Sequence, residues 1–401
     1  MKSQMISRKT DAVLTKNITN NDRSLGELRG FVKRNVYMPP LSIMIKPASA
    51  LCNMRCKYCF YHDVTDHRDV KSFGLMSEDT AECLIKKALE FADGESVAFA
   101  FQGGEPTIRG LDFFRFFVKK VAELNTKNST IYYGLQTNGT LIDSNWATFF
   151  KKYNFLIGLS LDGDFNNNSF RVDDKGNNAY YKITKAAEIL KKHQVDFNIL
   201  TVLTGRCADN IDDILKHFKK QGFKYLQFIP CLRPFGDKTE SELYMTPEQY
   251  KHFLIHGFNA YVKDYVRGEY TSIRYFDNIV HLYLGNPTEQ CGMCGHCSHQ
   301  FVAEGNGNIY PCDFYCTDEW LLGNINDSDK SFDTLAHCDK AIDFLKESII
   351  HPEECKNCKY YPLCRAEGCK RSKEDRSYCE SYKAFFDACL PLFRAFIAEK
   401  K

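Results

Sequence analysis

The stretch Cys52-Asn-Met-Arg-Cys56-Lys-Tyr-Cys59, followed by Phe60 and Tyr61, brings three thiols together within eight residues. Thiolates are soft ligands that favour iron–sulfur clusters, zinc or copper(I). A zinc ion would need a fourth ligand nearby. Three thiolates on a [4Fe–4S] cluster would instead leave one iron open to a small molecule. Two interpretations are therefore open, a structural zinc knuckle and a cluster with one open iron.

The composition is that of a globular protein whose cysteines bind metal. The chain has 401 residues, 44% hydrophobic and 26% charged, with a formal net charge of +2. This length predicts one to three domains, and the small net charge argues against nucleic acid as a partner. No apolar secretion signal opens the chain, and no apolar run is long enough to cross a membrane. We therefore expect a cytoplasmic protein, in which the eighteen cysteines stay reduced and bind metal rather than form disulfides.

Apolar runs alternate with segments of helical spacing between residues 41 and 230. The expected strands are Leu41–Ile45, Val97–Phe101, Ile131–Leu135, Phe155–Leu161, Phe197–Leu203 and Tyr225–Ile229. The expected helices between them are Ser77–Phe91, Leu111–Leu124, Asp143–Tyr153, Tyr180–Leu190 and Ile211–Phe218. Such alternation indicates a parallel sheet covered by helices. Six units are too few for an eight-fold barrel, so the predicted fold class is α/β with a partial, open (β/α)6 barrel.

Polar or cysteine-bearing turns follow the first four expected strands. The first strand leads into the three cysteines, and the next three end in Gln102-Gly-Gly-Glu-Pro106, Gln136-Thr-Asn-Gly139 and Ser160-Leu-Asp-Gly163. Functional groups of barrels gather at the carboxyl ends of the strands. The sequence therefore predicts one site over one mouth of the barrel, where glycines let the backbone approach a ligand and Glu105 can accept from an ammonium group.

The CxxxCxxC motif with GGEP one strand later resembles the radical SAM superfamily. The resemblance implies that Cys52, Cys56 and Cys59 hold a [4Fe–4S] cluster that binds and cleaves S-adenosylmethionine (SAM), giving a 5′-deoxyadenosyl radical. It also implies cofactor contacts from Tyr58, Gly104, Glu105, Ser160, Arg171 and Leu232. For Ser160 and Arg171 the alternatives are a strand-end hydroxyl and a solvated loop charge.

The chain changes character at Cys291, because twelve of its eighteen cysteines lie between there and Cys389. The pattern resembles the SPASM extension of radical SAM enzymes that modify peptides and proteins. That resemblance implies two auxiliary [4Fe–4S] clusters, three clusters in all, with ligand sets Cys291, Cys297, Cys312, Cys369 and Cys355, Cys358, Cys364, Cys379. Four residues rather than the usual three separate Cys364 from Cys369. Cys294 and Cys316 are the alternative ligands, and a zinc ribbon is the alternative site.

These patterns predict three parts of the chain. Residues 1–35 are a polar, flexible tail, residues 36–270 the barrel, and residues 271–401 a smaller cysteine-rich, cluster-binding domain. A long helix over Thr246–Val266 is expected near the end of the barrel, and a closing helix over Tyr378–Ala398 ends the chain.

A narrower resemblance covers the chain from about residue 36 to its end. Peptides such as Lys46-Pro-Ala-Ser49, Cys59-Phe-Tyr-His62, Ile273-Arg-Tyr-Phe-Asp277 and Tyr310-Pro-Cys-Asp-Phe-Tyr315 are similar to those of anaerobic sulfatase-maturating enzymes. The resemblance implies oxidation of a Cys or Ser of a sulfatase to Cα-formylglycine. A hydrogen atom leaves Cβ, Asp313 takes a proton, and an electron passes to an auxiliary cluster.

The resemblance also implies partners, and the residues leave alternatives open. The implied partners are a sulfatase segment of the form Cys/Ser-x-Pro/Ala-x-Arg and a flavodoxin- or ferredoxin-type electron donor. One alternative is a radical SAM/SPASM peptide maturase that forms cross-links or thioethers. A second is a non-enzyme, an iron–sulfur electron carrier or zinc scaffold. Asp313 itself has the alternative role of a loop-capping residue, since short Asx turns are common.

Overall fold

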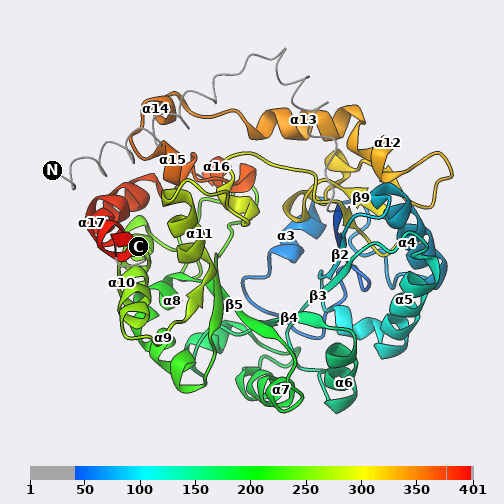
Figure 1. Ribbon diagram of the computed structural model, residues 1–401, viewed down its shortest axis with the longest axis horizontal. Coiled ribbons are helices and arrows are strands. Elements are labelled where there is room, and N and C mark those ends of the chain that lie inside the picture. Colours follow the sequence, from blue (N-terminus) through cyan, green and yellow to red (C-terminus); the bar gives the residue numbers. More distant parts are fainter. Residues whose placement is uncertain (1–40, 376, 399–401) are drawn as a thin grey trace.

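The computed structural model describes residues 41–375 and 377–398, so the predicted tail over 1–35 lies outside the described residues. Six parallel strands follow one another as predicted and pair in chain order: β1 (Leu41–Ile45), β2 (Val97–Phe101), β3 (Ile131–Thr137), β4 (Phe155–Ser160), β5 (Phe197–Leu203) and β6 (Tyr225–Pro230). The sheet curves around a central space with its helices outside (Figure 1). Its order, β10-β9-β8-β1 to β7, does not close among the described residues, which confirms a partial, open barrel.

The helices between the strands also match their predicted ranges within a few residues. They are α4 (Glu78–Ala92), α5 (Leu111–Leu124), α6 (Ser144–Lys152), α7 (Tyr180–Lys192), α9 (Ile211–Lys220) and α10 (Pro247–Val266). Ser77 caps α4 through the Thr80 N–H, and Thr246 opens α10 with a capping box to Gln249. Such caps satisfy backbone N–H groups that the first helical turn leaves unpaired. The short helices α3 (Phe60–Asp66) and α8 (Gly205–Asp209) were not predicted.

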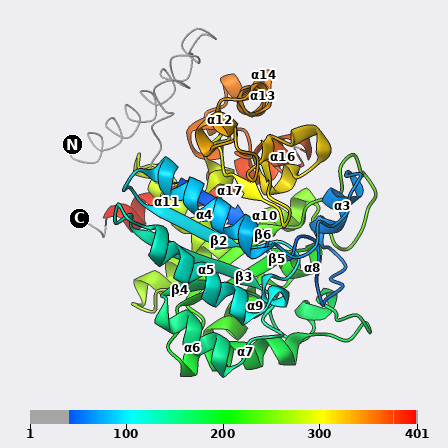
Figure 2. The ribbon, with the colours of Figure 1, turned by 90° about the vertical axis from the view of Figure 1, so that its right-hand side faces the viewer.

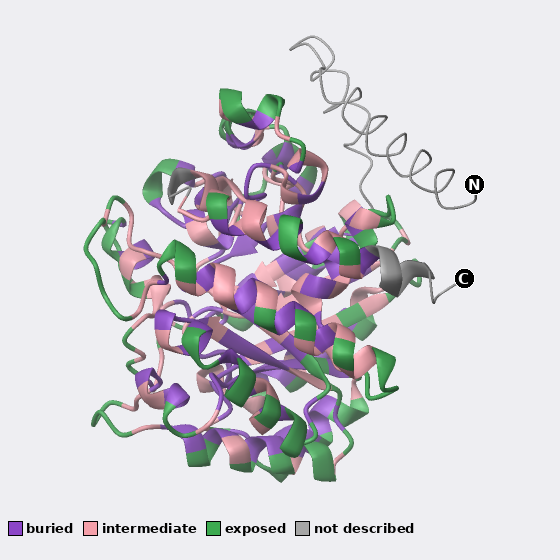
Figure 3. Cartoon of the chain, turned by 90° about the vertical axis from the view of Figure 1, so that its left-hand side faces the viewer, coloured by how far each residue is buried: buried purple, intermediate pink, exposed green. Residues whose placement is uncertain are grey.

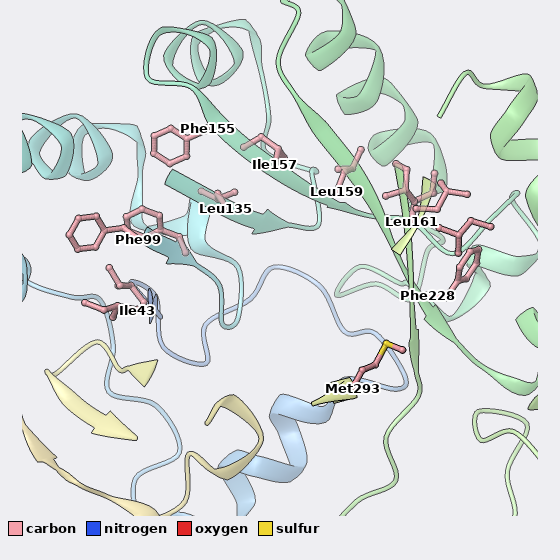
Figure 4. Packing of buried hydrophobic residues seen from close by; sticks show 14 of the residues in the cluster. Ile43, Phe99, Leu135, Phe155, Ile157, Leu159, Leu161, Phe228 and Met293 are labelled. Carbon is pink, nitrogen blue, oxygen red and sulfur yellow. The ribbon is translucent and has the colours of Figure 1, made fainter. Parts of the chain in front are cut away.

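The main core lies between the sheet and this outer layer of helices. Phe99 and Phe101 from β2 both pack edge-on against Phe117 of α5, with ring centroids 5.1 and 5.0 Å apart. Ile43, Phe99, Leu135 and Phe155 continue this layer across successive strands (Figure 4). Figure 3 shows buried residues on the sheet and exposed residues on the outer surface of the helices.

The opposite face of the strands carries many small residues. Register places Ala100 beside Gly134 on β3, and Gln136 beside Gly158 on β4. Because strand side chains alternate between faces, these residues point away from the helix-covered core. A Cβ on Gly158 would lie only 2.6 Å from Leu200 Cδ1. At Gly158 the missing side chain leaves room for Leu200 of the neighbouring strand.

The C-terminal region joins the barrel sheet at the free edge of β1. Strand β8 (Val302–Ala303) runs parallel to β1, and β9 (Asn308–Tyr310) and β10 (Gly323–Asn324) continue antiparallel from it. The other edge ends in β7 (Ser272–Ile273) beside β6. The sheet therefore runs across the predicted boundary at residue 270, and the division into domains stays a prediction.

Short helices complete this region. They are α11 (Arg274–Tyr283), α12 (Phe332–Ala336), α13 (Asp339–Ser348), α14 (Glu353–Lys356), α15 (Tyr361–Cys364) and α16 (Lys370–Asp375). Of these, α12, α13, α14 and α16 lie over one side of the sheet (Figure 2). The closing helix α17 (Cys379–Ala398), predicted from Tyr378, packs against α10, with the ring of Phe393 stacked 4.4 Å from Phe258. Across the described residues, every helix is too short or too polar to span a membrane.

Candidate active site

The three-cysteine loop connects β1 to α3 and is anchored to the segment that follows β4. The Arg55 N–H donates to Val172 O at 2.7 Å, and the Lys57 N–H donates to Phe170 O at 3.0 Å. The Cys59 N–H donates to Cys56 O at 3.2 Å, which curls the loop back on itself. These backbone bonds hold the loop over the carboxyl end of the sheet.

The structure brings the thiols of Cys52, Cys56 and Cys59 together. Burial is the main cause that raises the pKa of all three thiols, to about 11 for Cys52 and about 12 for Cys56. The thiol of Cys59 adds to the shift of both Cys52 and Cys56. Each thiol is free and half-buried. A metal centre binds the deprotonated form and releases the protons. Three converging thiols without a disulfide fit a cluster held at three irons, as the motif predicts.

The GGEP turn packs tightly against this loop. A Cβ on Gly104 would lie 2.1 Å from Leu51 O, and the Glu105 N–H donates to that same oxygen at 2.8 Å. Only glycine fits such an approach. The buried Glu105 carboxylate accepts from the backbone and hydroxyl of Thr107, the hydroxyl of Thr137 and the backbone of Asn138. Its role toward an ammonium group stays a prediction, while these bonds fix the turn to the end of β3.

A buried carboxylate joins two of the predicted cofactor residues. The Tyr58 hydroxyl donates to Asp162 Oδ2, and Arg171 Nε lies 3.0 Å from the same oxygen. Asp162 Oδ1 accepts from the Val202 N–H at 2.9 Å. The Arg171 guanidinium also lies 5.5 Å from the centre of the Tyr58 ring. The structure thus places Arg171 in a buried ion pair, not in a solvated loop.

The remaining predicted cofactor residues lie at the same ends of the sheet. Ser160 is the buried last residue of β4, and Leu232 is half-buried just after β6. Tyr58, Gly104 and Arg171 follow from the loops after β1, β2 and β4. The strand-end positions match the arrangement expected for one site over one mouth, and the individual roles stay predictions.

Asp313 lies in a 3-10 turn after β9 and is almost fully buried. Its Oδ1 is 2.8 Å from Lys46 Nζ, and its Oδ2 accepts from the Tyr61 hydroxyl at 2.9 Å and from Gln102 Nε2 at 3.2 Å. Among the described residues, no aligned hydrogen-bond donor reaches Oδ1. Asp313 is therefore oriented by three residues from the barrel, all more than two hundred residues before it in the chain.

A chain of buried charges supports this carboxylate. Lys46 Nζ lies 3.5 Å from Glu304 Oε1, and Arg68 Nη1 lies 2.9 Å from the same atom. Burial opposes the charge of Lys46, but Asp313, Cys316 and Glu304 outweigh burial and raise its pKa. Burial likewise opposes the charge of Glu304, yet Lys46 and Arg68 lower its pKa. The four groups alternate in sign, so each buried charge has an opposite neighbour.

Sequence reasoning did not single out Lys46, Tyr61, Gln102, Glu304 or Asp162. The positions of Lys46 and Gln102 could have indicated a role in the site, because these residues directly follow β1 and β2. Functional groups of barrels gather at such strand ends. Asp162 stands in the polar turn after β4. For Glu304 the sequence carries no comparable signal, since its partners lie more than two hundred residues away.

The first predicted auxiliary set comes together in the structure. The pKa of Cys291 is raised to about 12, mainly by burial and then by the thiols of Cys369 and Cys297. Burial also raises the pKa of Cys312, with further contributions from Cys369 and Cys297. Cys291 and Cys312 thus each lie near Cys297 and Cys369, and Cys291 also lies near the alternative ligand Cys294.

The second set lines one cavity together with Tyr360, Glu367 and Lys383. Cys355, Cys358, Cys364 and Cys379 all face this cavity. Burial raises the pKa of Cys364 to about 12, and Cys379 and Cys355 contribute to the shift. Four thiols around one cavity fit a fully ligated cluster, and they equally fit the alternative of zinc.

The four residues between Cys364 and Cys369, one more than usual, all have positive φ angles. Arg365, Ala366 and Glu367 have φ of 52°, 56° and 63°, and Gly368 follows with 76°. A Cβ on Gly368 would lie 1.8 Å from Gly292 O. Left-handed conformations persist in non-glycine residues only when the surroundings hold them. Here the tight turn sets Cys369 beside the Cys291 loop, so the longer spacing still delivers the thiol to the first set.

The two alternative ligands have other contacts. The Cys294 thiol donates to Gln290 O at 3.7 Å. Cys316 is fully buried, and its sulfur accepts from Lys46 Nζ at 3.3 Å. Cys316 therefore belongs to the charge network around Asp313 rather than to either group of four thiols.

Known proteins match this architecture over nearly all of its length. The model of the radical SAM superfamily matches residues 47–226, and that of the iron-sulfur cluster-binding SPASM domain matches residues 287–359. The solved structure of native anSMEcpe with bound AdoMet and Cp18Cys peptide has a TM-score of 0.84 and 43% identity, covering 90% of this chain and all of that one. Fold and site thus define a radical SAM enzyme with a SPASM domain, whose cofactors are SAM and [4Fe–4S] clusters.

The relatives narrow the class further. The cysteine-type anaerobic sulfatase-maturating enzyme of Clostridium novyi is 45% identical over 360 residues, which cover 87% of this chain and 95% of that relative. The serine-type enzyme of Bacteroides thetaiotaomicron is 29% identical, covering 90% and 92%. The chain belongs to the anaerobic sulfatase-maturating enzyme family.

Proposed function

We propose that this chain oxidises a cysteine of a sulfatase polypeptide to Cα-formylglycine. The observation that carries the proposal is the setting of Asp313, a buried carboxylate held by Lys46, Tyr61 and Gln102 next to Cys312. The choice of cysteine over serine as substrate is supported by 45% identity to the cysteine-type relative, against 29% to the serine-type relative.

The cofactors would be held by the residues at the strand ends. Cys52, Cys56 and Cys59 would ligate the first cluster, and Tyr58, Gly104, Glu105, Ser160, Arg171 and Leu232 would bind SAM. When bound and reduced, the cluster and SAM supply a 5′-deoxyadenosyl radical that removes a hydrogen atom from Cβ of the substrate. After a proton and an electron have also left, the cysteine is a thioaldehyde, which water hydrolyses to the aldehyde with release of hydrogen sulfide. Asp162 holds Tyr58 and Arg171 in fixed positions for this binding.

Asp313 has the position and the hydrogen-bond partners expected of a general base. Tyr61 and Gln102 bind its Oδ2, which fixes the plane of the carboxylate. Oδ1 keeps a lone pair for the proton of the substrate thiol. Lys46 stabilises the negative charge before that proton arrives. A carboxylate so placed serves as base once the substrate lies within hydrogen-bond reach.

The two groups of four cysteines would hold the auxiliary clusters, whose ordinary chemistry is one-electron transfer. Cys291, Cys297, Cys312 and Cys369 would form the first, and Cys355, Cys358, Cys364 and Cys379 the second. We further propose a flavodoxin- or ferredoxin-type protein as the electron donor. A cytoplasmic site of action belongs to the proposal, because cluster ligands must remain reduced thiols.

A peptide with the sequence Cys-x-Pro-x-Arg tests the proposal. Reduced enzyme with SAM should convert the cysteine to an aldehyde, seen by mass spectrometry as sulfur replaced by oxygen with loss of two hydrogens, and trapped by a hydrazine. The matched serine peptide should react more slowly. An unchanged peptide, or a peptide that carries an internal thioether or cross-link, would contradict the proposal and favour a peptide maturase.

A further inference from the structure

Three metal-ligating side chains gather on the outer surface of the barrel, on elements that carry none of the predicted cluster ligands. Asp212 opens α9, and His252 and His256 lie one turn apart on α10. One ligand atom from each lies within 4.8 Å of the other two. Neither the radical SAM site nor the two auxiliary groups use these residues.

The helical spacing places both imidazoles on one face. Residues four apart on a helix are neighbours, and the two rings stack with centroids 4.0 Å apart at an interplanar angle of 26°. His256 Nδ1 lies 2.9 Å from Asp212 Oδ2. The side chains of His256 and Asp212 are 46% and 63% exposed, so an ion and its waters can reach them.

Backbone contact fixes the tautomer of His252. Its Nδ1 lies 3.0 Å from Ala208 O. A carbonyl oxygen only accepts, so Nδ1 carries the hydrogen and Nε2 presents its lone pair. Imidazoles that bind metals are oriented in this way by a hydrogen bond from the other ring nitrogen. His252 is thus arranged as a ligand before any ion binds.

We propose that Asp212, His252 and His256 form a binding site for a divalent transition metal of the zinc class. Two imidazoles and a carboxylate suit Zn²⁺ better than Mg²⁺ or Ca²⁺, which prefer oxygen ligands throughout. Three protein ligands leave a position for water, as in zinc sites open to solvent. The ion takes the place of the hydrogen between His256 and Asp212, and the two stacked rings turn so that each aims a nitrogen at it. Bound in this way, the ion links α9 to α10. Because it binds the folded state, it stabilises the packing of these two helices.

Zinc titration of the reconstituted, cluster-loaded enzyme under anaerobic conditions tests the site. Isothermal titration calorimetry should show one Zn²⁺ that His252→Ala and His256→Ala each bind at least about tenfold more weakly, since loss of even an outer partner costs that much. His256 is exposed, His252 is half-buried, and neither is a predicted cluster ligand, so the variants should keep their iron content and circular dichroism. His281→Ala, which removes an exposed histidine of α11, is the matched control and should titrate like wild type.

A second measurement locates the ion. Anomalous diffraction at the zinc edge should show a peak between α9 and α10. Identical zinc isotherms for wild type, His252→Ala and His256→Ala would overturn the proposal. So would an anomalous peak found only at cysteines. Neither result bears on the peptide oxidation assay, so the two proposals fail separately.

Discussion

The barrel and the cysteine-rich region are built on different physical principles. In the barrel, five- to seven-residue parallel strands bury aromatic side chains such as Phe99, Phe101 and Phe155 against helices. Between residues 291 and 379, strands have two or three residues and most helices one or two turns. What gathers there is thiols, in two groups of four. A core of the first kind folds by burying apolar area, whereas a region of the second kind draws on metal ligation.

The largest expected effect is on SAM cleavage, which depends on the first cluster and not on the two auxiliary clusters. Cys52→Ala should abolish SAM cleavage, because the open cluster needs its third thiolate. The barrel should remain folded, since Cys52 only borders the hydrophobic core. Chromatographic assay of 5′-deoxyadenosine measures the loss, and far-ultraviolet circular dichroism measures the fold. Continued production of 5′-deoxyadenosine would disprove the assignment.

Cys364→Ala tests the cysteine-rich region. It opens the four-thiol cavity of the second auxiliary set, so iron per chain should fall by about a third of the three-cluster total. Hydrogen exchange should rise over residues 353–379 and stay unchanged over β2 to β5. An equal rise in hydrogen exchange in both regions would show that the barrel also depends on this cluster. The matched control is Cys83→Ala, a thiol of α4 outside both groups.

Asp313→Asn tests the contact between the two regions at the reacting atoms. Loss of a general base typically costs about 10²- to 10⁴-fold, so formylglycine formation should fall by that factor while SAM cleavage persists. Mass spectrometry of the peptide and assay of 5′-deoxyadenosine give both rates. Asp329→Asn, an exposed carboxylate of the same region, should leave both unchanged. Full aldehyde yield from Asp313→Asn would remove this residue from the mechanism.

Lys46→Met removes the cation that joins the regions. The substitution leaves Asp313 and Glu304 buried with fewer opposite charges. Breaking a buried ion pair lowers the free energy of unfolding by about 3–5 kcal/mol. Lys71→Met, whose partner Asp66 is also exposed, should leave the melting temperature nearly unchanged, because exposed ion pairs contribute little to stability. Thermal unfolding of both cluster-loaded variants measures the difference. Equal melting temperatures would mean that the buried charges are not coupled to stability.

Asp162→Asn should have the smallest effect, confined to the barrel. The variant keeps the shape of the side chain but weakens the ion pair with Arg171, so SAM should bind about tenfold more weakly, the low end of what such outer contacts contribute. Equilibrium binding of SAM measures this change. Asp174→Asn, an exposed carboxylate of the neighbouring loop, is the control. Unaltered SAM affinity in Asp162→Asn would show that Tyr58 and Arg171 keep their positions without it.

Much of the barrel could be predicted because its signals are local. Apolar runs gave β1 to β6, and Ser77 and Thr246 marked the starts of α4 and α10. Several site residues followed from one rule, that polar turns after parallel strands meet at one edge. The contacts of Asp313 could not be predicted in this way, since Tyr61 lies 252 residues before it.

The sequence by itself determined the six long strands, the helices between them, the three-cysteine loop and the position of Asp313 beside Cys312, because periodicity, capping and ligand spacing act over a few residues. Only the tertiary structure decided that β8 extends the sheet at β1, that Lys46 links Asp313 to Glu304, and that a left-handed turn brings Cys369 to Cys291. Such pairings depend on which sheet edge and which buried charge are left without a partner once the barrel has formed. No window of neighbouring residues holds that information.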